Sequence, residues 1–353
     1  MTAPAGTVPV GPGATQPPSP VLEPRRRARM IQLPRSPKIL VGLGLALFFV
    51  LLAIIGPLVA PDDPNASSST TIGTPLPPSG AHWLGTTKVQ QDILSQMLVG
   101  GRSTIVVSIL AGAIATVLAV LFGVSAGYFG GWIDDLLSML ANVFLVMPAL
   151  PLLIVIFGFL SRTTSPNDVL IGLVIALTGW AYGARVLRAQ TLSMRNRDYI
   201  ESARLIGERS WRIMMFEILP NLVPIVATSF LFTVIYGVGT YAALSFLGVI
   251  SVSHWSWGTI LYWAQSDQAA QQLRPEWWWF LPPGLALGLF GAALALLNFG
   301  IDEFINPRLR LAGLTGRRAR RAGLPTRPRL GLTPVLKPAR PGDDLVGTGE
   351  GAR

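Results

Sequence analysis

The sequence predicts an all-α, polytopic membrane protein with six transmembrane helices. Hydrophobic residues make up 50% of its 353 residues, charged residues only 13%, and the mean hydropathy is +0.50. Soluble domains carry about twice that share of charged residues. Uncharged stretches long enough to cross a bilayer, about 20 residues at 1.5 Å each, recur along the chain. Because the hydrocarbon core offers the backbone no hydrogen-bond partners, each such stretch is expected to be a helix.

Residues 1–38 precede the first apolar stretch and contain nine prolines and six Lys or Arg residues. Such a segment cannot bury enough apolar surface to offset the entropy of ordering it. We predict a disordered basic arm on the cytoplasmic side. Residues 311–353 are again rich in Arg, Gly and Pro and are predicted to form a disordered cytoplasmic tail, whose simplest roles are orientation or contact with anionic membrane lipid.

Between the two tails, six apolar stretches predict the spans: Ile39–Ala60, Ser103–Gly127, Leu136–Leu160, Val169–Ala184, one span within Ile218–Ser266, and Trp277–Ile301. The first stretch is too long for the core of a cleavable signal peptide and is expected to remain as a membrane anchor. Residues 61–102 then form an external loop. Residues 103–310 form a five-helix core, which includes a cytoplasmic loop at residues 185–220.

The stretch Ile218–Ser266 is long enough for two spans, and the distribution of charge decides between one and two. With one span there, 24 of the 28 Lys and Arg residues lie on the same face of the membrane. Cytoplasmic segments of membrane proteins carry such an excess of positive charge. We therefore predict one span, a re-entrant or surface segment at His254–Tyr262, and both termini in the cytoplasm of a multi-pass protein of the cell membrane.

The composition excludes several kinds of site. No cysteine is present, which excludes a disulfide framework, a thiol nucleophile and an iron–sulfur centre. The two histidines, His82 and His254, leave little for a metal site, so neither a metal nor a cofactor is expected. No lysine follows the glycine-rich turn of a phosphate-binding loop, so the chain is not expected to be an enzyme with its own ATPase site. The arginines of the tails are not interleaved with aromatic residues, which argues against a nucleic-acid partner.

The cytoplasmic loop contains the most informative segment, Tyr199–Gly207. Ala203 and Gly207 are four residues apart, which places them on one face of a helix and leaves a smooth strip for the close approach of another protein. Pro220 is predicted to stop the helix before the next span. The pattern favours a short helix presented to a partner, and the alternative is an ordinary amphipathic loop helix.

A longer pattern runs through this loop. The residues Glu-x-Ala-x-x-x-Gly, from Glu201 to Gly207, are followed after nine residues by x-Ile-Leu-Pro, which ends at Pro220. The pattern resembles the cytoplasmic signature of membrane subunits of ABC importers, in particular the second permease of the dipeptide/oligopeptide/nickel branch. Further matches to this branch follow in order over residues 38–310: Gly85–Thr86, Asp92–Ser95, Gly101–Ser103, Gly127–Gly131, Leu244–Gly248, Ser256–Gly258 and Asn306–Leu309.

The resemblance implies a type I ABC importer permease fold and the function of a transmembrane permease subunit. In such an importer the loop helix is a coupling helix, which inserts into a groove of a separate ATPase subunit. The residues implied in this coupling are Glu201, Ser202, Ala203, Gly207, Leu219 and Pro220. The last two of these would set the exit of the helix toward the next span.

The partners implied by the resemblance are a second, similar permease, two cytoplasmic ATP-binding subunits and an external solute-binding protein. The solute implied is of the peptide type, with an oligosaccharide as the alternative. A different class, an autonomous channel or an ion-coupled carrier, lacks an ionisable residue deep within any predicted span. Trp277–Trp279 are interpreted as an interfacial aromatic belt in preference to a sugar-stacking platform.

Overall fold

The computed structural model describes residues 37–67, 73–160, 167–250, 254–269 and 276–305, with side chains for those from 39 to 301. All of them belong to one of the two units into which the chain divides, the unit of residues 35–353. Every regular element in these ranges is a helix, and an isolated β-bridge joins Thr86 to Asp92. The prediction of an all-α protein is therefore confirmed.

The described residues contain five continuous helices that are long and apolar enough to cross a membrane. They are α1 (Pro37–Val59), α2 (Ile93–Phe129), α5 (Asp168–Met194), α8 (Leu219–Phe246) and α10 (Trp277–Ile305). A further candidate is the pair α3 (Gly131–Val146) and α4 (Ala149–Leu160), whose axes differ by 89°. The predicted number of six spans is reached if this bent pair counts as one span.

The predicted third span, Leu136–Leu160, is not a continuous helix. α3 ends at Val146 and α4 begins at Ala149, with Pro148 between them. A proline drives the preceding residue toward an extended conformation, and Met147 has φ −65° and ψ 131°. α4 has 12 residues and a helix rises 1.5 Å per residue, so α4 is only about 18 Å long. It cannot cross the hydrocarbon core alone.

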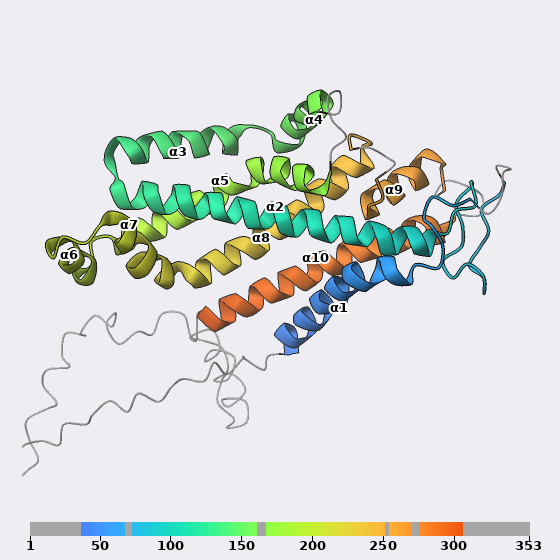
Figure 1. Ribbon diagram of the computed structural model, residues 1–353, viewed down its shortest axis with the longest axis horizontal. Coiled ribbons are helices and arrows are strands. Elements are labelled where there is room, and N and C mark those ends of the chain that lie inside the picture. The colour runs from blue at the N-terminus through green and yellow to red at the C-terminus, as the bar shows by residue number, and fades with distance from the viewer. Residues whose placement is uncertain (1–36, 68–72, 161–166, 251–253, 270–275, 306–353) are drawn as a thin grey trace, which may run out of the picture. The chain divides into compact units, whose positions relative to one another are not determined.

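Helix α2 lies at the centre of the bundle and packs against α1, α5 and α8 (Figure 1). Its contact with α5 is the most extensive between described helices. Small residues allow this close approach: a Cβ atom added at Gly123 would lie 2.5 Å from the carbonyl oxygen of Ala184 on α5. Because lipid supplies no hydrophobic driving force between helices, close packing of small residues is typical of membrane bundles.

The two ends of the bundle carry different elements (Figure 1). One end, named the α6 end, carries α6 (Asp198–Leu205), α7 (Ser210–Arg212) and the π-helical segment Ile213–Ile218. The opposite end, named the α9 end, carries α9 (Trp257–Ser266) and the loop of residues 73–92.

Two predicted loop boundaries are wrong, because helices continue through polar residues. The external loop predicted at 61–102 is too long, since α2 begins at Ile93. Asp92 caps this helix, and its Oδ2 accepts a hydrogen bond of 2.7 Å from the backbone N–H of Ser95. The loop predicted at 185–220 begins too early, since α5 continues to Met194. A hydropathy pattern detects the part of a helix inside the membrane and misses its polar extensions.

The connection between α8 and α10 contains one helix among its described residues, α9. This helix has ten residues, so its length of about 15 Å is half the thickness of the hydrocarbon core. Ser256 begins it in a capping box with Thr259. The prediction of a single span within Ile218–Ser266 agrees with the one candidate span found there, and His254–Tyr262 overlaps the short helix.

The aromatic run at the start of α10 is only partly at the surface. Trp277 is 49% exposed, but Trp279 is 1% exposed and packs in a cluster with Phe49 and Phe290. Successive residues of a helix point about 100° apart, so three consecutive tryptophans cannot all face outward. The interpretation as an aromatic belt is wrong for Trp279, which belongs to the core.

Candidate functional site

Helix α6, in the connection between α5 and α8, is the element that the loop pattern singles out. It begins after Arg197, carries Asp198 and Glu201 in its first turn, and carries Arg204 in its last turn. These charges have the signs that the helix dipole favours at each end. With eight residues, α6 is too short to be stable in isolation. Its stability must therefore come from packing.

The inner face of α6 is anchored in the core. Ile200 is fully buried, in a cluster that also holds Leu187 of α5 and Ile213 of the π-helical segment. Ala203, one turn further on, is half-buried against the same cluster. α6 contacts the π-helical segment that leads into α8, and its buried face belongs to the same core cluster as residues of α5. If α6 is displaced, the residues of this cluster on α5 and before α8 must therefore move or repack.

The carboxyl end of α6 is closed by Gly207, which has φ +85°. Its N–H donates to the carbonyl of Arg204 at 3.0 Å, and the N–H of Glu208 donates to the carbonyl of Ala203 at 3.1 Å. These two bonds form a Schellman motif, whose left-handed position glycine fills without steric cost. The prediction that Ala203 and Gly207 share one helical face is wrong, because the helix ends at Leu205 and the chain turns at Gly207.

The outward surface of the loop carries an apolar tip, formed by Leu205, Ile206, Trp211 and Phe216. Leu205 and Ile206 are 83% and 81% exposed. Trp211 and Phe216 are exposed as well, and their rings meet edge to face at 6.2 Å. Large apolar side chains exposed in this way are typical of surfaces that contact another protein or lipid. The sequence analysis missed this tip, although a Leu-Ile pair directly before a helix-ending glycine, among charged residues, was a signal for it.

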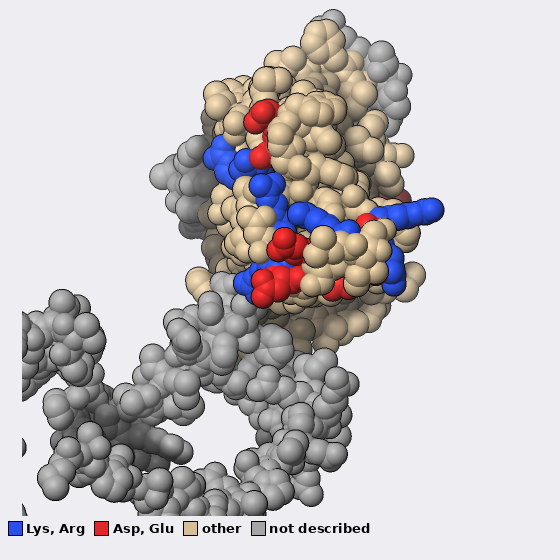
Figure 2. Space-filling view, turned by 90° about the vertical axis from the view of Figure 1, so that its left-hand side faces the viewer, with Lys and Arg blue, Asp and Glu red and all other residues tan. Residues whose placement is uncertain are grey.

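Charged side chains surround this tip. Figure 2 looks onto the α6 end and shows basic and acidic side chains gathered there. The described arginines of this end are Arg185, Arg188, Arg195, Arg197, Arg204, Arg209 and Arg212. The described part of the α9 end has Lys88 and Arg102 as its basic residues. The α6 end is therefore suited to water and not to lipid.

Arginines of α5 also fix α3 beside the loop. Arg188 forms an ion pair with Asp134 of α3, with Nη2 donating to Oδ2 at 2.7 Å. One turn earlier, Nη2 of Arg185 donates to Oδ1 of Asn142 at 2.6 Å. These bonds cross-link α3 and α5. Arg185, Arg188 and Asn142 line a cavity of about 360 Å³, to which α2 also contributes.

A wide pocket of about 500 Å³ opens beside α6. It is lined by Tyr128, Phe129, Arg195, Asn196, Arg204, Glu208 and Ser210. The guanidinium carbon of Arg204 lies 4.7 Å from the centre of the Tyr128 ring, so the pocket lies where α6 meets the end of α2. Its lining is largely polar and suits a partner's polar side chains.

The exit from the loop differs from the prediction. Leu219 and Pro220 are the first two residues of α8, and the π-helical segment Ile213–Ile218 runs directly into them. Proline is tolerated in the first turn of a helix, where its missing N–H would have no partner in any case. Pro220 therefore does not stop the helix. The structure brings Glu201, Ser202, Ala203 and Gly207 together at α6 and leaves Leu219 and Pro220 beyond the π-helical segment.

A bundle of apolar helices long enough to cross a bilayer, with a short helix packed outside it, is typical of a polytopic membrane protein. Residues 119–311 match the family described as binding-protein-dependent transport system inner membrane component. Residues 27–78 match the N-terminal transmembrane domain of oligopeptide transport permease C. The chain belongs to the family of binding-protein-dependent transport system inner membrane components, which are the permease subunits of ABC importers.

Curated relatives cover most of the chain. The dipeptide transport system permease protein DppC of Bacillus subtilis is 30% identical over 79% of this chain and 84% of its own length. A putative peptide transport system permease of Brucella abortus is 31% identical over 81% of this chain and 92% of its own length. The oligopeptide transport system permease protein OppC of Mycobacterium tuberculosis is 32% identical over 66% and 78%. The predicted importer permease fold and permease function are confirmed.

Proposed function

We propose that this permease forms half of the translocation path of an ATP-driven importer for peptide-type solutes, and that α6 is its coupling helix. The observation that carries the proposal is the combination of an anchored inner face at Ile200 with an exposed apolar tip at Leu205 and Ile206. The peptide class of solute is supported by the names of the relatives, which are peptide, dipeptide and oligopeptide permeases.

Some residues of α6 dock to the partner, and others anchor the helix in the bundle. Glu201 and Ser202 are exposed beside the tip and contact the ATPase subunit, while Ala203 holds the helix against the core. Gly207 ends the helix so that Leu205 and Ile206 project. Leu219 and Pro220 begin α8 and receive the movement through the π-helical segment.

Coupling follows from these attachments. Binding of ATP closes a pair of ATP-binding subunits and draws the coupling helices of this chain and of a second, similar permease together. Because Ile200 belongs to the core cluster that also includes Leu187 of α5 and Ile213 before α8, this movement passes into the bundle. A bundle switches between two states only if its partner binds one of them more tightly. The closed ATPase pair supplies that difference in affinity.

The α6 end faces the cytoplasm in this proposal, and both chain termini lie on the same side. The excess of arginine at the α6 end of the described residues over the α9 end supports this orientation. The protein is then a multi-pass component of the cell membrane. The α9 end faces outward and receives the solute from an external solute-binding protein.

The docking of α6 is tested by cross-linking, which the absence of cysteine makes direct. A benzophenone attached to Ser202→Cys should form a product with the ATP-binding subunit in the assembled transporter. The same group attached to Ala66→Cys, an exposed residue before the loop of the α9 end, should form none. Absence of the ATP-binding subunit from the Ser202→Cys product would overturn the docking role.

The orientation is tested with the same two variants in intact cells. A membrane-impermeant thiol reagent should label Ala66→Cys from outside and reach Ser202→Cys only after permeabilisation. The reverse pattern would place α6 outside and refute the orientation.

The solute and the energy source are tested by uptake into proteoliposomes that contain the whole transporter and its solute-binding protein. Labelled dipeptides and tripeptides should accumulate only when ATP is present on the side of the membrane that carries the ATPase subunits. Accumulation of a labelled oligosaccharide and of no peptide would show that the solute is an oligosaccharide and refute the peptide proposal. Accumulation driven by an ion gradient without ATP would show that the protein is an ion-coupled carrier and refute the ATP-driven mechanism.

A further inference from the structure

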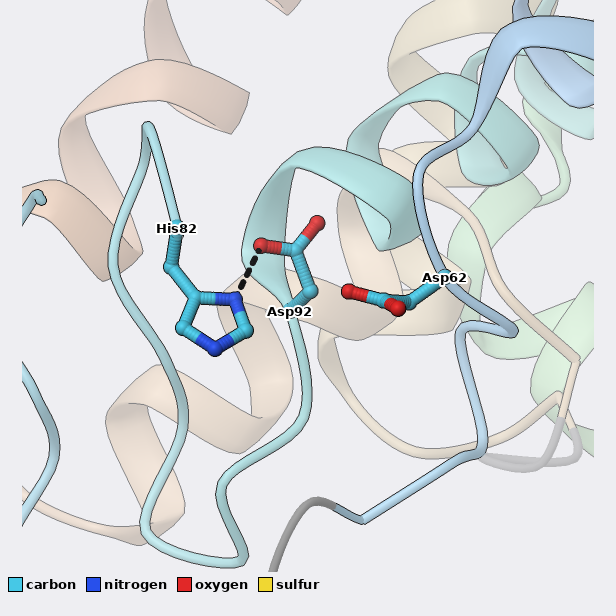
Figure 3. A group of neighbouring side chains, drawn as sticks. All are labelled: Asp62, His82 and Asp92. Atoms are coloured by element: carbon cyan, nitrogen blue, oxygen red, sulfur yellow. Dashed lines mark hydrogen bonds and ion pairs between the residues drawn. The ribbon is translucent and has the colours of Figure 1, made fainter. Parts of the chain in front are cut away.

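Three side chains that can each bind a metal ion meet at the α9 end: Asp62, His82 and Asp92 (Figure 3). They come from three segments, namely the stretch just after α1, the middle of the loop 73–92, and the cap of α2. One ligand atom from each side chain lies within 4.8 Å of the other two. The sequence analysis expected no metal site, because it could not see that the fold brings His82 beside Asp92 and Asp62.

Hydrogen bonds hold the carboxylate of Asp92, the ring of His82 and the backbone of Asp62 in position. Oδ2 of Asp92 accepts from the backbone N–H of Ser95 at 2.7 Å and from its hydroxyl at 2.8 Å. Oδ1 of Asp92 is thereby directed to Nδ1 of His82, 3.1 Å away. The Ser95 hydroxyl also accepts from the backbone N–H of Asp62 at 3.1 Å. One serine therefore sets the position of both aspartates.

The backbone around His82 is also fixed. Its N–H donates to the Ser79 hydroxyl at 3.2 Å, and its carbonyl accepts from the N–H of Ser79 at 2.8 Å and of Gly85 at 3.0 Å. The imidazole is therefore presented by a closed turn. Sites arranged in advance in this way lose little entropy when a ligand binds.

The charge of the cluster favours a cation. Asp92 is 3% exposed, and the carboxylate of Asp62 forms no hydrogen bond or ion pair with a described residue. Lys88, the lysine of this loop, is directed elsewhere, because its Nζ donates to the carbonyl of Asp267 at 2.6 Å and lies 3.7 Å from its carboxylate. The cluster thus holds two carboxylates and a single imidazole, which is paired with Asp92, so it carries net negative charge.

We propose that Asp62, His82 and Asp92 bind a first-row divalent cation, for which Zn²⁺ is the best fit. One imidazole nitrogen and two carboxylates suit Zn²⁺ better than Ca²⁺ or Mg²⁺, which take oxygen ligands. Two ligands at bond lengths of about 2.0–2.1 Å on a tetrahedral Zn²⁺ lie about 3.3 Å apart. The observed 3.1 Å between Nδ1 and Oδ1 is close to this separation. The ion replaces the proton between them, and water completes its coordination.

Such an ion would tie the stretch that leaves α1 to the beginning of α2. The first membrane helix and the loop 73–92 would then be fixed to the core at the α9 end, where the solute-binding protein docks in the proposed importer. The cation site rests on the geometry of this cluster and does not depend on the proposed function.

The test uses the full-length chain in detergent, purified with a tag free of histidine and treated with a chelator. Competition with a zinc indicator should show one Zn²⁺ bound per chain, and bound zinc should raise the midpoint of thermal unfolding. Asp62→Asn and His82→Gln should each weaken binding by at least about tenfold, as the loss of a ligand requires. His254→Gln, which alters the other histidine, should bind as the wild type does.

Two outcomes overturn the proposal. One is the absence of zinc binding by the wild-type chain, which would leave the His82–Asp92 contact as an ion pair that only supports the cap of α2. The other is equal binding by all four proteins, which would show that zinc binds elsewhere. Asp62→Asn keeps the test decisive if His82→Gln does not fold, because the Asp62 side chain is exposed and its carboxylate has no partner among the described residues.

Discussion

The guanidinium group of Arg204 lies 4.7 Å from the centre of the Tyr128 ring, which joins the last turn of α6 to the last turn of α2. Tyr128 is 7% exposed and belongs to the same core cluster as Ile200. The end of α6 next to the apolar tip is therefore attached to the central helix of the bundle. Its beginning is anchored by Ile200 in the core cluster that also includes Leu187 of α5.

Removal of this contact should loosen α6 without unfolding the bundle. Arg204→Ala loses a cation–π contact of about 0.5–1 kcal/mol, while alanine preserves the helix propensity. Hydrogen exchange of residues 198–206 should become about two- to fivefold faster, as that energy requires. The control is Arg209→Ala, an exposed arginine of the same loop, which should leave the exchange unchanged. Equal acceleration in both variants would show that the Tyr128 contact does not hold the helix.

Substitutions in the apolar tip should uncouple transport from ATP hydrolysis. Leu205→Asp and Ile206→Asp each remove an apolar contact of about 1.5–3 kcal/mol and place a charge in the proposed interface. Transport and solute-stimulated ATPase activity should each fall by at least about tenfold, because 1.4 kcal/mol corresponds to tenfold. Both side chains are more than 80% exposed, so the abundance and thermal stability of the chain should not change. Leu205→Met should retain activity, and normal coupling in the aspartate variants would refute the docking role.

The turn at Gly207 should be sensitive to the smallest side chain. Its φ of +85° is strained for any residue with a Cβ atom, although no atom lies within 4 Å of the position that a Cβ would take. Gly207→Ala should therefore cost about 1 kcal/mol from backbone strain and not from a clash. Exchange within α6 should rise about fivefold, which corresponds to that energy. Gly288→Ala, at a helical position with equally open space, should be neutral or stabilising, and a similar response at both sites would contradict the role of the left-handed turn.

The contact between α2 and α5 should not tolerate a larger residue at Gly123. A Cβ atom there would meet the Ala184 carbonyl oxygen at 2.5 Å, so Gly123→Val must push the helices apart. A cost of at least about 1–3 kcal/mol is expected for such overpacking. The variant should show a lower unfolding midpoint and less folded protein by size-exclusion chromatography in detergent. Gly158→Val on α4 has open space around it and serves as the control, and equal loss in both variants would locate the sensitivity outside the helix contact.

The sequence alone was sufficient for the membrane class, for most of the candidate spans and for the position of the loop that carries α6. These features depend on apolar stretches and on charge counts, which are local properties of the chain. The ends of α2 and α5 could not be found in this way, because the helices continue into polar residues. Pro148 in the third span predicts a kink, but hydropathy is the same for a straight and for a broken span, so the size of the bend could not be predicted.

The details of the candidate sites depend on contacts between distant residues. Gly207 was identified, but its role was assigned to a smooth helical strip, because a period of four residues cannot reveal that the helix ends at Leu205. The exposure of Ile206 follows only once the direction of that turn is known. Asp62, His82 and Asp92 are separated by 20 and 10 positions in the sequence, and only the folded loop brings them together.

His254 makes the other histidine contact of the α9 end, with Asp168 at the start of α5. Its Nε2 lies 2.7 Å from Oδ1 of Asp168 and 3.4 Å from the hydroxyl of Ser103. The three residue types are those of a hydrolytic triad, but a triad uses one ring nitrogen for the serine and the other for the carboxylate. Here both contacts involve Nε2, so the group cannot relay a proton and its role is structural.

This ion pair should make the stability of the α9 end depend on pH. The pKa of His254 is raised because its ring donates a hydrogen bond to Asp168, and burial opposes this only in part. For a group with a raised pKa, the stabilisation is complete below the unfolded pKa of about 6.5 and is lost as pH rises through the higher folded value. The unfolding midpoint, measured with a chelator present so that no metal contributes, should therefore fall as pH rises from about 6 to about 8.5. His254→Gln should reduce this slope while leaving the midpoint at alkaline pH near that of the wild type, and an unchanged slope would show that the pair with Asp168 does not contribute.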